Sequence, residues 1–247
     1  MTDPIVVPVS GSFRDPGGRI YLRGDQVFRT VTSIAAGDFD YVRNTGLIDL
    51  LVEKGKLVDE KKVDKSVLPD LPSVEYLLEH PKIDFISYPY EWSFSLLKDA
   101  ALHQLDVILE SLKFGVTLSD ATAYNIQFNG IKPIFIDHLS FRKYQEGEYW
   151  LAHKQFCDQF LNPLLLRSLL GVSHNAWYRG SLEGISAEDL GPLLKFRHKL
   201  KLGVFTNVVL QSKLQKKSTA SKASKSTGGR PLQKQAFEYM IRALAKQ

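Results

Sequence analysis

The sequence contains very little cysteine. Cys157 is the single cysteine among 247 residues, which excludes an internal disulfide and any metal site built from several cysteines, and fits the reducing cytosol. Long apolar runs are also missing: residues 160–172 form the most apolar stretch, but Asn162, Pro163 and Arg167 interrupt it, and it is too short to span a bilayer. No basic region followed by an apolar one opens the chain, so no secretory signal is visible. We therefore expect a cytoplasmic protein with no membrane partner.

Negative charge is scarce in the last part of the chain. Residues 213–247 contain nine Lys and Arg but one Glu, a net charge of +8. The whole chain carries +5, so residues 1–212 carry −3 and all of the excess positive charge lies in the tail. A nucleic-acid-binding body would carry its basic residues on a folded face. We therefore expect no specific nucleic-acid partner.

Glycine-rich phosphate-binding motifs are missing as well. The chain has no Gly-x-Gly-x-x-Gly, and its nearest glycine-rich segment, Asp-Pro-Gly-Gly at residues 15–18, is a turn by composition. Residues 19–23 and 26–31 alternate apolar and polar side chains around a second turn at Gly24-Asp25. This alternation predicts two strands joined by a tight turn.

Apolar spacing predicts the other elements. The most strongly supported helix follows Ser93, a good N-cap, and carries a wide apolar stripe that ends at Gly115. Weaker patterns predict helices at 38–56, 74–79 and 150–170, and strand-like segments at 84–92 and 204–210.

The chain is organised around residues 118–141. Asn129-Gly130 lies between two β-type runs, which predicts a hairpin because both residues tolerate positive φ. The strands of this hairpin start just after Asn125 and end just before Asp137, so the two side chains are expected at the same end. Asp120 lies in the loop that leads into the first strand. Two carboxylates and one amide are therefore expected to converge.

This constellation is suited to phosphoryl transfer, because Mg²⁺ prefers hard oxygen ligands and a separate carboxylate can accept the proton of an attacking hydroxyl. The segment resembles the catalytic core of protein kinases and of aminoglycoside and choline phosphotransferases. The resemblance implies Asp120 as catalytic base, Asn125 and Asp137 as Mg²⁺ ligands, and ATP as the phosphate donor. Two departures are present: Leu118-Ser119 replaces His-Arg, and Asp137-His138-Leu139 replaces Asp-Phe-Gly.

The same resemblance assigns roles outside the hairpin. No strand lysine is available to hold the phosphates; Arg29 is the nearest candidate, with Asp40 as its helix partner, although an exposed strand arginine is the alternative. Residues 84–92 would form the hinge where the adenine binds, with Tyr88 and Glu91 as candidate nucleotide contacts. The alternative for these aromatic residues is packing between the two lobes.

The tail has the composition of a linker followed by a helix. Residues 211–232 are rich in Ser, Thr, Lys, Ala and Gly and contain no aromatic residue. Residues 233–247 place Phe237, Met240, Ile241 and Leu244 on one face of a short amphipathic helix. Such a helix docks on the body, dimerises, or begins a further module.

Across residues 10–210 the chain also resembles the N-terminal part of bacterial proteins related to the rhizobial nodulation protein NoeA. The resemblance is carried by Ser12 to Gly18, Ser87 to Ser95, Asp120 to Phe128 and Pro133 to Phe141. In those relatives a similar region precedes an S-adenosylmethionine-dependent methyltransferase domain. No strand followed by a Gly-x-Gly turn for that cofactor is evident in this chain.

Together these features predict an α+β, protein-kinase-like fold with a reduced small β-lobe (1–90), a mainly helical lobe that carries the hairpin (91–210), a basic linker (211–232) and a terminal helix (233–247). The first functional hypothesis is a domain that binds ATP and Mg²⁺ and transfers phosphate to a small molecule or sugar. The alternative is a catalytically inactive kinase-like module that accompanies a methyltransferase, with the terminal helix as the contact to that domain or partner.

Overall fold

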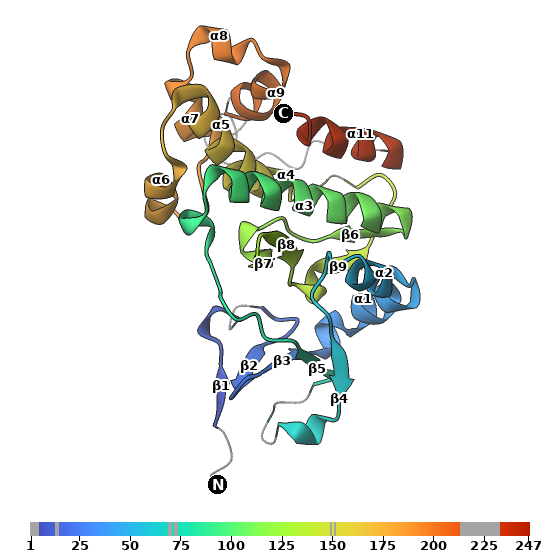
Figure 1. The fold of residues 1–247 in the computed structure, drawn as a ribbon. Coiled ribbons are helices and arrows are strands. Elements are labelled where there is room, and N and C mark those ends of the chain that lie inside the picture. Colours follow the sequence, from blue (N-terminus) through green and yellow to red (C-terminus); the bar gives the residue numbers. More distant parts are fainter. Residues whose placement is uncertain are drawn as a thin grey trace, which may run out of the picture.

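A five-stranded antiparallel sheet forms one end of the molecule in the computed structural model (Figure 1). The structure describes residues 5–12, 15–68, 71, 74–148, 150, 152–212 and 233–247. The strand order is β1-β2-β3-β5-β4. The bounds are Val6–Pro8 (β1), Ile20–Arg23 (β2), Gln26–Val31 (β3), Lys61–Val63 (β4) and Tyr76–His80 (β5). The predicted turn at Gly24-Asp25 joins β2 to β3, with Arg23 opposite Gln26 and Gly24 at φ +59°.

Two helices follow β3 and pack against the main hydrophobic core of the helical lobe. They are α1 (Ser33–Asn44) and α2 (Leu47–Glu53), whereas one helix over 38–56 was predicted. Gly46 separates them because its φ of +77° is left-handed and cannot continue a helix. Val42, Leu47, Ile48 and Leu51 are buried in the main core rather than under the sheet. The small lobe is therefore anchored through these helices to the helical lobe.

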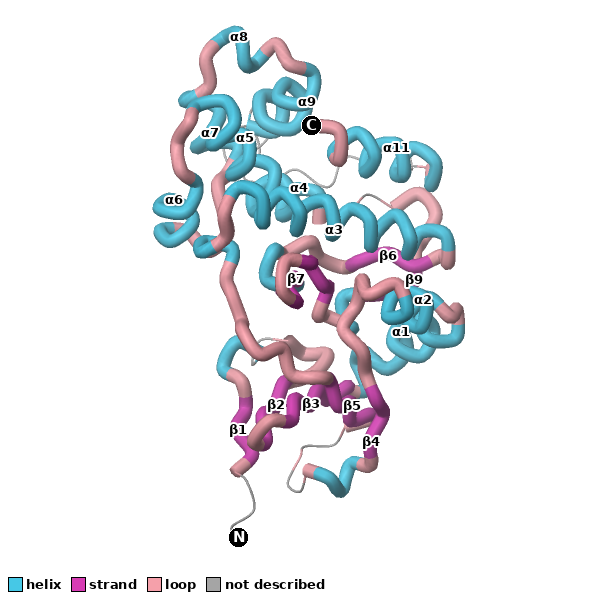
Figure 2. Tube along the Cα trace, viewed as in Figure 1, coloured by secondary structure: helices cyan, strands magenta, loops and turns pink. Residues whose placement is uncertain are grey.

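The helical lobe is built around α3 (Phe94–Lys113). The hydroxyl of Ser93 accepts a hydrogen bond from the Leu96 backbone N–H, and Gly115 at φ +68° follows the end of the helix, as predicted. Figure 2 shows helices clustered in this half and strands mostly in the other. The remaining helical segments are α4 (His153–Phe156), η6 (Cys157–Leu161), α5 (Asn162–Leu170), α6 (His174–Gly180), α7 (Ala187–Leu193), α8 (Phe196–Lys199), α9 (Leu202–Val204), η7 (Phe205–Leu210) and α11 (Lys234–Leu244).

Two short antiparallel pairs lie between α3 and the sheet. β6 (Val116–Leu118) pairs with β9 (Phe141–Lys143), and β7 (Ile126–Asn129) pairs with β8 (Lys132–Phe135). The predicted hairpin is confirmed with its turn shifted by one residue: Asn129 pairs with Lys132, so Gly130, at φ +64°, and Ile131 form the turn. The short 3₁₀ turn η5 (His138–Ser140) connects β8 to β9.

Three predictions of secondary structure were wrong. Residues 76–80 form β5 instead of a helix, because they pair with β3 along its length. Residues 84–92 contain no strand; they form an extended crossing segment with one 3₁₀ turn, η3 (Pro89–Glu91). Residues 205–210 form the helical turn η7 instead of a strand, although Val208 and Val209 favour strands by propensity.

The order of elements is that of a protein-kinase-like domain, which confirms the α+β fold class. A five-stranded antiparallel sheet with a helix after its third strand leads through a crossing segment to a long helix and then to a hairpin-bearing loop. The terminal helix α11 docks on the body, with Phe237, Ile241 and Leu244 buried in the main core. The predicted linker lies almost wholly in residues 213–232, outside the described residues. Among the described residues, no helix has both the length and the apolarity needed to cross a membrane.

Candidate active site

The two short strand pairs bring Asp120, Asn125 and Asp137 together. Pairing of β6 with β9 extends to the Ser119 N–H, which donates to the Ser140 carbonyl at 2.8 Å, so Asp120 lies beside Ser140. Pairing of β7 with β8 extends to the Ile136 N–H, which donates to the Asn125 carbonyl at 2.9 Å. Asn125 therefore lies opposite the residue that precedes Asp137. The convergence predicted from the hairpin is present.

Ser140 joins the three side chains. Its hydroxyl oxygen lies 2.5 Å from Asp120 Oδ1 and 2.9 Å from Asp137 Oδ2. Asn125 Nδ2 donates to the same hydroxyl at 3.1 Å and to Asp120 Oδ1 at 3.0 Å. Ser140 is 2% exposed, so water does not replace these contacts. We refer to Asp120, Asn125, Asp137 and Ser140 as the carboxylate cluster.

Sequence reasoning missed Ser140. The signal available was its spacing: Asp137 is the N-cap of η5 and its side chain accepts from the Leu139 N–H at 3.1 Å. A residue three positions after an N-cap returns toward the capping side chain in a 3₁₀ turn. Ser140 occupies that position and carries a hydroxyl.

Arg29 on β3 connects the carboxylate cluster to the glycine-containing turn at residues 15–18. Its Nη2 lies 2.9 Å from Asp137 Oδ1 and 2.8 Å from Asp15 Oδ2. The alternative of an exposed strand arginine was wrong, because Arg29 is 8% exposed. The predicted partner Asp40 was also wrong: the Asp40 carboxylate accepts from the Tyr76 hydroxyl at 3.0 Å.

The turn at residues 15–18 is held against β3 and the cluster. The Gly17 N–H donates to Asp15 Oδ1 at 2.8 Å, and the Thr32 N–H donates to the Gly17 carbonyl at 2.9 Å. A Cβ atom on Gly18 would lie 1.8 Å from the Thr30 carbonyl oxygen and 3.0 Å from Leu139. Glycine is therefore required here by close approach of the backbone to β3.

Burial and charge raise the pKa of Asp120 to about 6. Loss of water around the carboxyl group is the largest cause, and the negative charge of Asp137 adds to it, whereas hydrogen bonds from Ser140 and Asn125 act in the opposite direction. A hydroxyl has one hydrogen, so Ser140 cannot donate to both aspartates at once. A proton on Asp120 lets Asp120 donate to Ser140 and Ser140 donate to Asp137. Within the cluster, Asp120 is therefore the carboxylate that takes up a proton most readily. A pKa near neutral pH is typical of groups that exchange protons in an active site.

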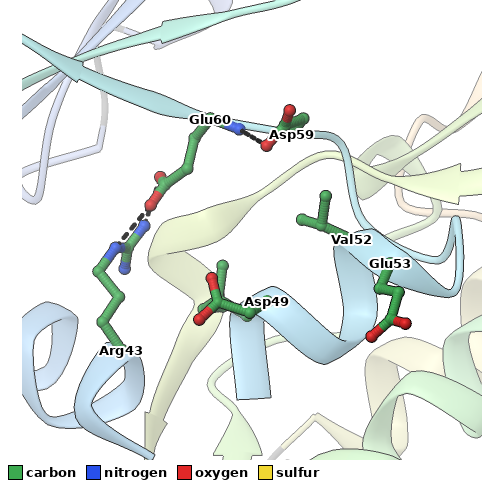
Figure 3. Close-up of a pocket in the computed structure, with 7 residues that line it drawn as sticks. Arg43, Asp49, Val52, Glu53, Asp59 and Glu60 are labelled. Atoms are coloured by element: carbon green, nitrogen blue, oxygen red, sulfur yellow. Dashed lines mark hydrogen bonds and ion pairs between the residues drawn. The ribbon is translucent and has the colours of Figure 1, made fainter. Parts of the chain in front are cut away.

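His138 directly follows Asp137, but its ring makes its contacts outside the carboxylate cluster. Its buried Nε2 lies 2.7 Å from the Val58 carbonyl, and its Nδ1 lies 3.3 Å from Glu60 Oε2. Burial lowers the pKa of His138 well below its usual value, so the ring is neutral. Figure 3 shows Glu60 reaching Arg43, with which it forms an ion pair. Together with Asp49, Glu53 and Asp59, these two residues line a pocket of about 390 Å³. This pocket is separate from the carboxylate cluster.

The structure does not bring Tyr88 and Glu91 to the cluster through any contact among the described residues. Glu91 Oε2 accepts from the Tyr88 N–H at 2.8 Å, which caps η3, and the Tyr88 ring stacks on Tyr90 at 5.5 Å between centroids. Both lie in the crossing segment between sheet and α3. Its link to the hairpin is made instead by Ser87, which exchanges two 3.0 Å hydrogen bonds with the Gln127 side-chain amide.

The donor set fits an open magnesium site. Among the described residues, no three His, Cys, Asp or Glu side chains gather into a metal cage. Mg²⁺ sites that also use substrate phosphates need one or two carboxylates or amides from the protein, and Asn125 and Asp137 supply that number. Asp15 and Asp137 contact the single guanidinium of Arg29, and Asp120 adds a third carboxylate whose charge acts on Asp137. When all three are ionised, two negative charges are left uncompensated, which is the charge of one divalent cation.

Comparison with known proteins identifies a homologue. No family model matches the chain. The solved structure of vaccinia related kinase 3 shows a TM-score of 0.42 and 12% sequence identity, covering 100% of this chain and 84% of that chain. A TM-score this low does not establish a common fold, and the fold class is instead defined by the order of elements along the chain. Nodulation protein NoeA of Rhizobium meliloti (strain 1021) is 44% identical over 240 residues, which cover 96% of this chain and 50% of that protein. The chain is therefore a homologue of nodulation protein NoeA, and it spans about half of that protein's length.

Proposed function

We propose that this chain binds ATP with Mg²⁺ and transfers phosphate to the hydroxyl of a small molecule or sugar. Asp120 is the base that receives the hydroxyl proton, and Asn125 and Asp137 are the metal ligands. The observation that carries the proposal is the single Ser140 hydroxyl, which lies within 2.5–3.1 Å of all three side chains.

The protein groups supply positioning and charge in this proposal. A pKa of about 6 leaves Asp120 ionised in a large fraction of molecules at neutral pH, yet basic enough to accept a proton. Mg²⁺, when bound, neutralises charge on the phosphates. Arg29 then serves as the second cation, because β3 carries this arginine and no lysine. Tyr88 and Glu91 are proposed to contact the nucleotide from the crossing segment, with the adenine between this segment and the hairpin.

One observation favours a second candidate function. The Arg29 guanidinium already contacts Asp137 Oδ1, one of the two oxygens that this carboxylate can offer to a metal ion. An aspartate oxygen that contacts an arginine instead of a metal ion suits a catalytically inactive kinase-like module. The half of NoeA that this chain does not span leaves room for a methyltransferase domain that such a module would accompany.

Ligand-dependent stability separates the two candidates. Saturating ATP with Mg²⁺ is expected to raise the free energy of unfolding by about 2.7 kcal/mol at a hundred times Kd. Asp137→Ala should lose this Mg²⁺-dependent gain, and Asp120→Asn should keep it while losing phosphate transfer. Asp99→Asn on α3 is the matched control, because it removes a carboxylate outside the cluster. No stabilisation of the wild-type chain by any nucleoside triphosphate with Mg²⁺ would overturn the proposal in favour of the inactive module.

A further inference from the structure

Four large apolar side chains are exposed within ten residues at the outer end of the helical lobe. Phe196 is 78% exposed, Leu200 68%, Leu202 78% and Phe205 48%. Phe196 begins α8, Leu200 follows the end of α8, Leu202 begins α9 and Phe205 begins η7. We call these four side chains the apex patch.

The backbone that carries the apex patch is anchored in the core. Leu194, His198 and Val204 alternate with the exposed side chains and are 3–5% exposed. The Phe205 N–H also donates to the Lys201 carbonyl at 2.8 Å, which continues the chain into η7. The buried residues therefore anchor this segment in the core, while the apolar side chains of the patch face the solvent.

Basic side chains are interleaved with the apex patch. Lys195 directly precedes the patch, and Arg197, Lys199 and Lys201 lie between its members. Within the described part of the chain none of these four side chains forms an ion pair with a carboxylate. The sequence from residue 190 to residue 237 contains eleven Lys and Arg and no Asp or Glu. This one-signed charge attracts an anionic surface.

The apex patch lies far from the sheet and from the carboxylate cluster. Figure 1 shows α8 at the end of the molecule opposite to β1 and β4. A cavity of about 360 Å³ at the foot of the patch is lined by Leu165, Leu169, Lys201 and Val204 among others. This end of the molecule thus combines exposed apolar side chains, neighbouring basic side chains and a cavity that Lys201 helps to line.

We propose that the apex patch binds the surface of an anionic lipid bilayer, with Phe196, Leu200 and Leu202 entering the headgroup boundary. Surface-attached proteins combine apolar side chains that enter this boundary with Lys and Arg that meet anionic headgroups. Nucleic acid would use the basic side chains but gains little from exposed leucines. Our expectation of no membrane partner rested on the absence of a spanning segment, which attachment at the surface does not need.

The test is co-sedimentation of the full chain with lipid vesicles. Binding is expected to vesicles of phosphatidylcholine and phosphatidylglycerol in equal parts, and much more weakly to phosphatidylcholine alone. Replacement of Phe196 and Leu202 together by Ser should lower the affinity by about tenfold or more, because their apolar surface no longer leaves water. Replacement of Lys195 and Lys201 together by Gln should lower it by about 25-fold, since each basic residue near such a surface contributes about fivefold.

Matched variants elsewhere distinguish the patch from general stickiness. Ile34→Ser with Ile131→Ser removes two side chains that are 74% and 84% exposed outside the patch, and Lys61→Gln with Lys65→Gln removes two exposed charges near β4. Both controls should bind like wild type. The proposal is overturned if the patch variants bind as tightly as wild type, or if replacing the basic residues of 213–232 alone abolishes binding. Self-association of the wild-type chain without lipid, lost in the Phe196 and Leu202 variant, would identify a second copy as the occupant and also overturn it.

Discussion

Arg29 Nη2 lies 2.9 Å from Asp137 Oδ1, so a residue of the sheet directly contacts the aspartate that ends the hairpin. The same guanidinium lies 2.8 Å from Asp15 in the glycine-containing turn. One side chain therefore ties the turn, the sheet and the carboxylate cluster together, although the three segments are far apart in the sequence. Replacement of Arg29 should therefore lower the free energy of unfolding and also weaken ligand binding.

Replacement of Arg29 by Gln is expected to lower the free energy of unfolding by about 2–4 kcal/mol, because it leaves Asp15 and Asp137 facing each other without their shared cation. Urea unfolding measures the change. Arg19→Gln on the neighbouring exposed position is the control and should change stability by less than about 0.5 kcal/mol. An equal effect of both variants would show that Arg29 contributes only as a surface residue.

The stability of the chain should depend on pH through Asp120. Its pKa is raised from 3.8 to about 6 in the folded chain, so the folded state binds a proton more tightly than the unfolded state. Its contribution is fully present below about pH 4 and is lost as the pH rises through about 6, a loss of about 3 kcal/mol. Asp120→Asn cannot titrate, so the variant should gain stability relative to wild type over this window and keep a constant difference above it. A difference that does not change with pH would contradict the raised pKa.

Ser140→Ala removes the hydroxyl that separates Asp120 from Asp137. The expected loss is about 1–3 kcal/mol, the range for a buried polar group left without its partner. The pH range over which Asp120 changes the stability should also shift to higher pH. The reason is that the hydrogen bond from Ser140 lowers the pKa of Asp120, and the variant lacks it. Ser111→Ala is the control: Ser111 is equally buried, but its hydroxyl donates only within α3, to the Val107 carbonyl at 2.7 Å. Similar losses for both serines would exclude a particular role for Ser140.

Local signals were sufficient for the hairpin and for α3. The helix has its own cap and stop at Ser93 and Gly115, and the hairpin has a glycine that takes a left-handed conformation. Since the hairpin sets the separation of Asn125 and Asp137, most of the candidate site was predictable from one short segment. The remaining member, Ser140, depends on a 3₁₀ turn whose pattern in the sequence is weak.

Contacts between distant segments explain the failures. Tyr76 to His80 has apolar spacing that also suits a helix, but pairing with β3 makes it a strand. Asp40 is on the helix expected to face Arg29, yet the packing of α1 directs its carboxylate to Tyr76. Neither the strand pairing nor the rotation of a helix about its axis is encoded within the segment itself.

Gly18→Ala should disrupt the turn that carries Asp15. The added methyl group would lie 1.8 Å from the Thr30 carbonyl oxygen, a backbone atom that cannot move away without breaking β3. We expect a loss of about 3 kcal/mol or more in the free energy of unfolding, in the range of severe overpacking. Gly11→Ala is the matched control, because its Cβ would meet nothing within 4 Å. Retained stability in Gly18→Ala would show that the turn does not lie against β3.

The docked position of α11 predicts that the terminal helix unfolds together with the body. Phe237 is fully buried and its ring lies 6.1 Å from that of Tyr144 and 6.0 Å from that of Trp150. Phe237→Ala should therefore lower the free energy of unfolding of the whole chain by about 3–5 kcal/mol. Tyr239→Ala, on the same helix but 74% exposed, should change it by less than about 0.5 kcal/mol. Circular dichroism should show one unfolding transition in each variant. A separate loss of helix at lower denaturant, with an unchanged main transition, would contradict this prediction. It would mean that α11 unfolds independently and that the core around α3 is stable without it.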